Sequence, residues 1–248
     1  MRALILTCDA KLVKTYAPLA QSRGFGLELQ LFPPLDDASA VIANYAPSLE
    51  GFTGLRTSHG PYADLCPGSP DPMVRQVAAH RIGQVLPIAR SLGAGPLVVH
   101  HGYVPHSSQV EQWVLRSCAF WRAELAGLPQ GMSFHVENYF DYTPDVLLRV
   151  AREVNDPRLG ICLDIGHCHA ISRTPLLKWI EALGDRVTYV HLHDNDGTAD
   201  QHRALGQGNA PVADALAALE KLAPQAIWCL EGNALESLAW LETHGFRL

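Results

Sequence analysis

Short apolar runs alternate with helix-like stretches along the chain, and this alternation restricts the possible folds more than any other feature. Near-continuous apolar strands indicate burial on both faces, which is typical of a parallel sheet covered by helices. Eight such strand–helix units predict a single (β/α)8 TIM barrel. A doubly wound open sheet is the alternative, but no Gly-x-Gly-x-x-Gly motif follows the first run. The predicted strands span residues 3–7, 27–32, 55–58, 96–99, 132–136, 160–163, 187–192 and 226–230.

The composition indicates one globular unit. The chain has 248 residues, of which 48% are hydrophobic and 18% charged, so we expect residues 1–248 to form a single domain. No apolar run is long enough to cross a membrane. The start of the chain is too soon interrupted for a secretory signal. The six cysteines show no Cys-x-x-Cys spacing, and we expect a cytoplasmic protein with reduced thiols.

Residues that commonly bind metals stand at the ends of six successive predicted strands. The carboxyl ends of barrel strands meet at one mouth, so these side chains should converge there. Four carboxylates in one dry mouth would repel one another unless cations neutralise them. The pattern therefore predicts a divalent-metal site, although each residue alone has a structural explanation, such as a helix cap for Asp164. The strand ends carry His59, His100, Glu137, Asp164, His191 and Glu231, and the following loops add His167, Asp200 and His202.

Several motifs around these residues together resemble those of a known superfamily. They are Ser58-His59-Gly60-Pro61-Tyr62, His100-His101-Gly102, Val136-Glu137-Asn138, Leu163-Asp164-Ile165-Gly166-His167, His191-Leu192-His193-Asp194, Asp200-Gln201-His202, Leu205-Gly206-Gln207-Gly208 and Leu230-Glu231. From about residue 59 to residue 231 the chain resembles the xylose isomerase-like TIM barrel superfamily, and within it the endonuclease IV (AP endonuclease family 2) branch.

The resemblance implies a site for up to three zinc ions, with manganese as the alternative metal. His59 and His100 would hold one ion and share Glu137 with a second. The second ion would also bind Asp164, His191 and Glu231, and the third would bind His167, Asp200 and His202. The His-x-Gly spacing favours His100 over His101 as the ligand. Further residues predicted to hold substrate or to orient ligands are Tyr62, His101, His135, His193 and Arg203.

Two features disfavour duplex DNA as a partner. The net charge is −6, and residues 32–37 are acidic where a DNA-binding loop would be basic. Tyr62 matches a DNA-contacting tyrosine of the family, but it equally fits a pocket wall. We expect a small-molecule phosphoester, or a sugar or sugar phosphate, as the substrate. The sequence does not predict the oligomeric state.

Three functions remain compatible with the sequence, and the first is favoured. The chain would hydrolyse a phosphoester of a small molecule or nucleotide with a metal-bound hydroxide, because three ions among four carboxylates leave a positive site. Alternatively, a one-metal isomerase or epimerase would use Glu137 and Glu231 for proton transfer. The third possibility is a non-catalytic metal- or sugar-binding barrel. The predicted catalytic residues are Glu137, Glu231 and Asp164. An isomerase that transfers a hydride would use a lysine, and the four lysines lie away from the strand ends, so we set that mechanism aside.

Overall fold

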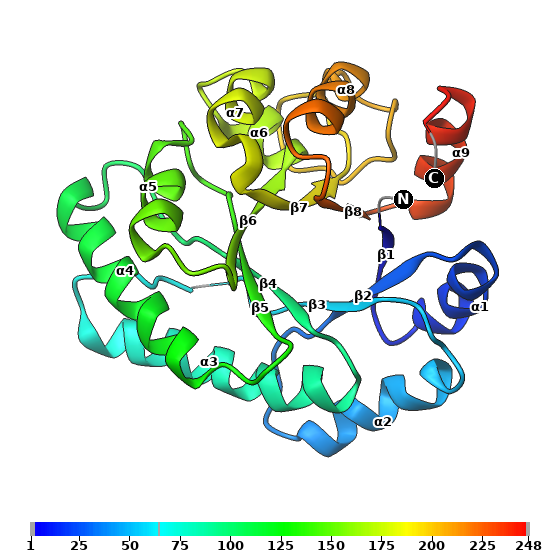
Figure 1. Cartoon of the computed structure of the whole chain (residues 1–248), viewed down its shortest axis with the longest axis horizontal. Coiled ribbons are helices and arrows are strands. Elements are labelled where there is room, and N and C mark those ends of the chain that lie inside the picture. Colours follow the sequence, from blue (N-terminus) through cyan, green and yellow to red (C-terminus); the bar gives the residue numbers. More distant parts are fainter. Residues whose placement is uncertain (1–2, 64, 247–248) are drawn as a thin grey trace.

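The computed structural model describes residues 3–63 and 65–246, and its eight strands close into a parallel barrel (Figure 1). Each strand pairs with its neighbour in the sequence, and the first strand pairs with the last. This topology confirms the predicted (β/α)8 barrel. The strands are β1 (Leu4–Cys8), β2 (Gly26–Gln30), β3 (Arg56–His59), β4 (Pro96–His100), β5 (Ser133–Glu137), β6 (Leu159–Asp164), β7 (Val187–Leu192) and β8 (Ile227–Leu230).

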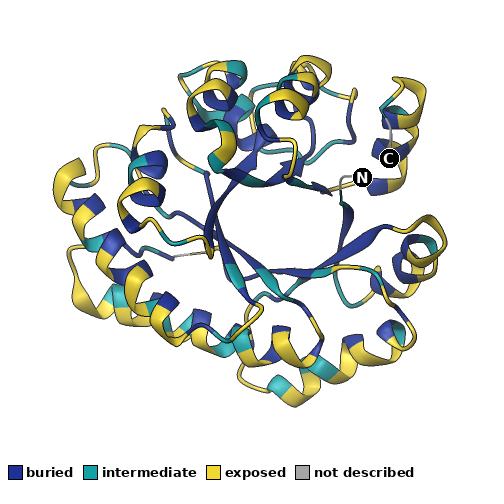
Figure 2. Cartoon of the chain, viewed as in Figure 1, coloured by how far each residue is buried: buried dark blue, intermediate teal, exposed yellow. Residues whose placement is uncertain are grey.

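Helices surround the barrel and bury one face each against the strands (Figure 2). The strands are dark along most of their length, whereas the outer faces of the helices are exposed. The elements are α1 (Val13–Arg23), α2 (Ala38–Leu49), α3 (Pro72–Ser91), α4 (Val110–Gly127), α5 (Asp145–Val154), α6 (Ile165–Ile171), α7 (Leu176–Leu183), the 3₁₀ turn η1 (Gly184–Arg186), α8 (Val212–Leu222) and α9 (Ala234–Thr243).

Local sequence explains where the longest helix begins. Asp71 precedes α3, and its carboxylate accepts a hydrogen bond from the backbone N–H of Met73 at 2.8 Å. Pro72 occupies the first helical position, where a missing N–H has no consequence. The sequence predicted both features. The short helix α6 was not predicted. A helix cap was, however, the structural explanation offered for Asp164, and its carboxylate does accept a hydrogen bond from the backbone N–H of His167 at 2.7 Å.

The barrel interior beneath the mouth is closed. It is filled by a cluster of buried side chains, namely Ile5, Val98, Cys162, Tyr189 and Cys229. One carboxylate, Glu28 on β2, is completely buried among them. All six cysteines carry free thiols. Among the described residues, no helix combines the length and the apolar character needed to cross a membrane.

Candidate metal centre

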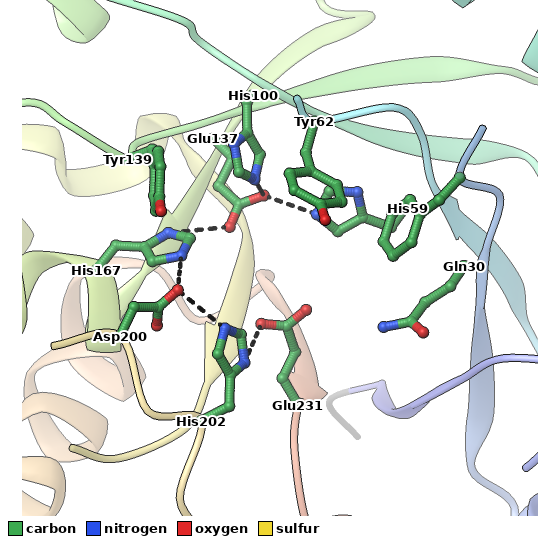
Figure 3. A pocket seen from close by; sticks show the side chains of 11 residues that line it. Gln30, His59, Tyr62, His100, Glu137, Tyr139, His167, Asp200, His202 and Glu231 are labelled. Carbon is green, nitrogen blue, oxygen red and sulfur yellow. Dashed lines mark hydrogen bonds and ion pairs between the residues drawn. The ribbon is translucent and has the colours of Figure 1, made fainter. Parts of the chain in front are cut away.

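A pocket of about 260 Å³ opens at the carboxyl ends of the strands (Figure 3). It is smaller than the roughly 300–1,000 Å³ of typical drug-binding pockets. Imidazoles and carboxylates make up most of the lining, and three aromatic side chains and one amide complete it. The lining residues are Gln30, Phe32, His59, Tyr62, His100, Glu137, Tyr139, His167, Asp200, His202 and Glu231.

Glu137 lies at the centre of the first group of predicted ligands. Its Oε2 is 3.2 Å from Nε2 of His59 and 3.5 Å from Nε2 of His100. Its Oε1 is 3.0 Å from Nδ1 of His191 and 3.4 Å from Nδ1 of His167. The strand register sets His100 beside Glu137, which brings the two side chains to the same level of the barrel. One carboxylate therefore faces four imidazoles.

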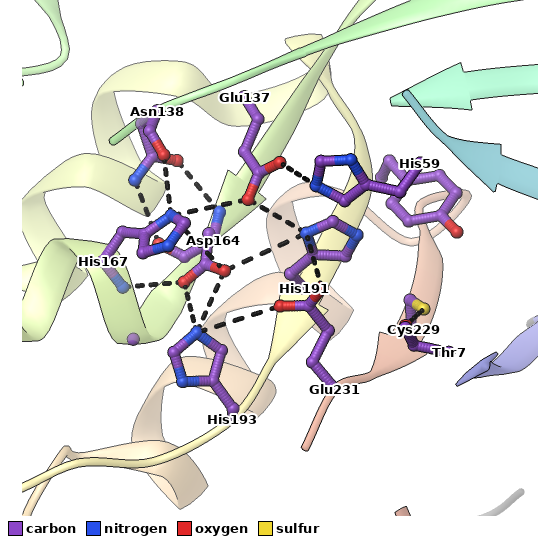
Figure 4. A network of polar contacts seen from close by, with 12 residues as sticks. Thr7, His59, Glu137, Asn138, Asp164, His167, His191, His193, Cys229 and Glu231 are labelled. Carbon is purple, nitrogen blue, oxygen red and sulfur yellow. Dashed lines mark hydrogen bonds and ion pairs between the residues drawn. The ribbon is translucent and has the colours of Figure 1, made fainter. Parts of the chain in front are cut away.

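Asp164, His191 and Glu231 form a second group next to Glu137, below it in the view of Figure 4. The register pairs Asp164 with His191. His191 Nδ1 lies 3.9 Å from an oxygen of Asp164 and 3.8 Å from an oxygen of Glu231. The structure thus brings together the three side chains predicted to share one ion with Glu137.

Asp200 connects the third predicted group. Its Oδ2 is 3.2 Å from Nε2 of His167 and 3.1 Å from Nε2 of His202. His193 joins this group, because its ring stacks on His202 with 3.9 Å between centroids and its Nε2 lies 3.0 Å from Asp164. The sequence predicted that His193 holds substrate or orients ligands, whereas its position allows it to act as a ligand itself.

The loop that carries Asp200 and His202 is held by a buried carboxylate. Asp194 accepts hydrogen bonds from the backbone N–H groups of Gly206, Gly208 and Ala210 at 2.9–3.1 Å. A Cβ on Gly208 would lie 2.1 Å from the carbonyl oxygen of Asn195, so this position requires glycine. These contacts explain the Gly-x-Gly motif as a structural element of the loop.

Three residues predicted to contact substrate or ligands do not reach the pocket. His101 points away from it, because neighbouring residues at a strand end face opposite sides, and its ring packs edge-on against Trp113. His135 lies one layer below Glu137 and contacts Ser133 and Thr188. Arg203 forms a 2.8 Å ion pair with Asp196 within the loop. Tyr62, by contrast, lines the pocket.

Burial and the charges of neighbouring side chains strongly shift the pKa values of the imidazoles and carboxyls in the site. Burial opposes ionisation of Glu137, but the adjacent His191 and His100 hold the pKa of this carboxyl well below its usual range. Burial also opposes protonation of His167, yet Asp164, Asp200 and Glu137 raise its pKa to about 10. Burial lowers the pKa of His100 to about 3. Cations would therefore displace protons from several imidazoles.

The donor set fits divalent metal ions. Carboxylate oxygens and imidazole nitrogens are the ligands that zinc and manganese accept. Within the described part of the chain, Glu137 Oε2 and Asp200 Oδ1 are buried without a hydrogen-bond partner. Metal-binding histidines usually donate their second N–H to an outer acceptor. His59 Nδ1 donates to the Gly60 carbonyl at 2.9 Å, and its Nε2 is directed at Glu137. His167 Nδ1 donates to the Asn138 carbonyl at 2.9 Å, and its Nε2 is directed at Asp200.

Some pocket residues were not predicted from the sequence. Gln30 lies at the end of β2 and Phe32 two residues later, and neither is a residue type that commonly binds metals. Tyr139 follows Glu137 by two residues, and this spacing at the end of a strand could have identified it. Glu28, below the pocket, also had a detectable signal, since it is an ionisable residue inside the alternating strand pattern 27–32.

Comparisons with known proteins agree with the fold and the motifs. An uncharacterized protein of Methanocaldococcus jannaschii is 27% identical over 71% of this chain and 63% of its own length. A probable endonuclease 4 of Mycobacterium leprae is 28% identical over 69% of this chain and 70% of its own length. The match to the first of these relatives spans less than two thirds of that protein.

Solved structures show the same architecture. The Thermus thermophilus protein TTHB071, soaked with ZnCl2, superposes with a TM-score of 0.77 and 27% identity over 98% of this chain and 97% of its own. A D-tagatose 3-epimerase-like protein, at 22% identity and a TM-score of 0.74 over 98% and 96% of the two chains, shares the fold. The family described as xylose isomerase-like TIM barrel matches residues 23–244. The chain belongs to the xylose isomerase-like TIM barrel family.

Proposed function

We propose that this protein is a metal-dependent hydrolase that cleaves a phosphoester of a small molecule or nucleotide. The observation that carries the proposal is the third ligand group. Asp200, His202 and His167 line the same pocket as Glu137, and His167 links the two groups by contacts of 3.2–3.4 Å. A one-metal isomerase has no need of this third group, whereas a multi-metal hydrolase does.

The proposed ligands are the nine side chains of the three groups, with His193 as an additional candidate for the third. When bound, divalent ions supply Lewis acidity toward a phosphoryl oxygen and make water acidic enough to lose a proton near neutral pH. Among the described residues that line the pocket there is no lysine or arginine. A phosphoester anion would therefore depend on bound cations and on histidine for charge complementarity.

The protein's own carboxylates would handle protons in this reaction. Glu137 and Glu231 reach the pocket from opposite sides of the barrel, while Asp164 lies behind them and fixes His193 and the start of α6. We propose that Glu231 accepts and holds a proton at its carboxylate, while Glu137, whose pKa is held well below its usual range, stays ionised and would hold the ions. Tyr62 and Tyr139 form walls that orient the substrate and exclude water. The chain's charge of −6 supports a small substrate over duplex DNA.

A sugar isomerase or epimerase is the second candidate function. It is supported by the same pair, because Glu137 and Glu231 face one small pocket from different strands, as proton transfer at a carbon next to a carbonyl requires. Such a reaction needs one ion held near Glu137, Asp164, His191 and Glu231, and it does not need Asp200 or His202.

The two candidates differ in their response to loss of the third group. We expect Asp200→Ala/His202→Ala to lower hydrolysis of bis(p-nitrophenyl) phosphate, with zinc or manganese supplied, by about 100-fold or more. Two variants at exposed positions, His80→Ala and Asp185→Ala, serve as matched controls and should retain wild-type rates. Full phosphodiesterase activity in the double variant would contradict the proposal. Ketohexose epimerisation that survives in the double variant would support the second candidate instead.

A further inference from the structure

Glu28 is a carboxylate sealed inside the barrel, one layer below the pocket. Its side chain has no exposed surface. The Thr7 hydroxyl donates to Oε1 at 2.9 Å, and the Tyr189 hydroxyl donates to Oε2 at 2.7 Å. Tyr189 is in turn held by the Thr57 hydroxyl at 2.9 Å. Side chains from β1, β3 and β7 thus fix the position of a charge on β2.

His191 lies between this carboxylate and the candidate metal centre. Its Nε2 is 3.1 Å from Glu28 Oε2, on the side away from the pocket. Its Nδ1 is 3.0 Å from Glu137 Oε1 and faces Asp164 and Glu231 at less than 4 Å. Only Nδ1 is therefore directed at the proposed ligands. His59 is arranged the other way round, with Nδ1 on the Gly60 carbonyl and Nε2 directed at Glu137.

We propose that Glu28 is a positioning residue: it accepts the Nε2–H of His191, fixes the ring orientation and tautomer, and so presents the Nδ1 lone pair to the metal centre. A carboxylate in this position also makes the imidazole a more basic ligand, and such outer partners typically change metal affinity or activity 10–100-fold. His191 has no backbone carbonyl in this role, so the buried charge takes its place. The inference rests on the metal centre of the proposed function and is independent of the reaction carried out there.

A separate metal site at Glu28, His191 and Cys229 is the competing explanation, because their potential ligand atoms lie close together. The contacts argue against it. Both oxygens of Glu28 already accept hydrogen bonds from hydroxyl groups, and all three side chains are completely buried. Burial and the nearby Glu28 raise the pKa of the Cys229 thiol to about 12, so the sulfur remains protonated and is a poor ligand.

The test compares Glu28→Gln with Glu124→Gln, a matched variant of a half-buried carboxylate on α4. Zinc affinity is measured by chelator competition, and Co²⁺-loaded protein is examined by visible absorption. We expect Glu28→Gln to weaken zinc binding at one site about 10–100-fold and to change the Co²⁺ spectrum. Glu124→Gln should change neither. Wild-type zinc affinity in folded Glu28→Gln would overturn the inference.

A measurement on the wild-type protein covers the case in which Glu28→Gln fails to fold. In ¹⁵N NMR of the zinc-loaded protein, we expect His191 to carry its proton on Nε2. A metal on Nε2 would overturn the inference without any variant. The inference and the proposed function fail separately, since zinc affinity and ring protonation do not depend on phosphoester hydrolysis. Normal zinc binding without phosphodiesterase activity would contradict only the proposed function.

Discussion

Asp141 is a carboxyl side chain buried without a close charged partner. Its Oδ1 has no hydrogen-bond partner in the described part of the chain, and the nearest ring nitrogen is Nε2 of His101 at 3.6 Å. Burial raises the pKa of Asp141 to about 8 and lowers that of His101 to about 3, so neither side chain compensates the other. The folded chain therefore retains a proton on Asp141 that the unfolded chain loses near pH 4.

This difference predicts that stability falls as pH rises from about 4 to about 8. Asp141→Asn removes the ionisable group while keeping the shape. We expect it to raise the free energy of unfolding by more than about 1 kcal/mol at about pH 8.5, and by less at about pH 5. Urea unfolding at both pH values measures the effect. An equal change at the two pH values would show that Asp141 is ionised in the folded protein.

At the level of residues, the sequence predicted which types converge but not always which way each one points. The nine predicted ligands all lie at one mouth, because barrel topology brings strand ends together. The side chain of His101 points away from the pocket because of the backbone conformation at the end of its strand. His135 lies below the pocket because of its position along β5. His193 joins the third group only because the loop folds His202 back onto it, which is a tertiary contact.

The packing of His193 against the short helix α6 depends on one glycine. A Cβ on Gly166 would lie 2.0 Å from Cε1 of His193. Gly83, inside α3, has open space around its Cα. Alanine is about 1 kcal/mol better than glycine in a helix, so Gly83→Ala should stabilise the protein by up to that amount. Gly166→Ala should instead destabilise it by more than about 1 kcal/mol, because the ring of His193 must move.

Thermal or urea unfolding of the two glycine variants gives the comparison, and zinc titration follows the site. Displacing His193 should also weaken binding at the third ligand group, whereas Gly83→Ala should bind zinc as the wild type does. If Gly166→Ala proved as stable as Gly83→Ala, with unchanged zinc binding, the close packing of His193 against α6 would be wrong.

Elements with strong periodic patterns were predicted well from the sequence. The strand at 187–192 has the predicted bounds, and helix α3 begins after the predicted cap. Helix α6 was missed because seven residues give too little periodicity, and because a predicted metal ligand supplies its cap. The loop after β7 was recognised by its ligands, but the role of Asp194 in holding it depends on three backbone contacts that no local pattern reveals.

For the molecule as a whole, the barrel follows from eight repeated units, and family membership agrees with it. The reaction is harder to predict, because the chain is similar in sequence to a probable endonuclease 4 and shares its fold with an epimerase-like protein. Both of the functions proposed above would place Glu137 and Glu231 at the reacting centre. What distinguishes them in this account is the number of cations that the mouth holds, since the third ligand group matters only to a multi-metal site.

Metal content per chain tests this central claim most directly. It is measured by elemental mass spectrometry on untagged protein purified without chelator and then equilibrated with zinc or manganese. We expect more than one ion per wild-type chain, and one ion fewer in Asp200→Ala/His202→Ala, with the His80→Ala control unchanged. A single ion per chain, retained unchanged in the double variant, would contradict the multi-metal centre.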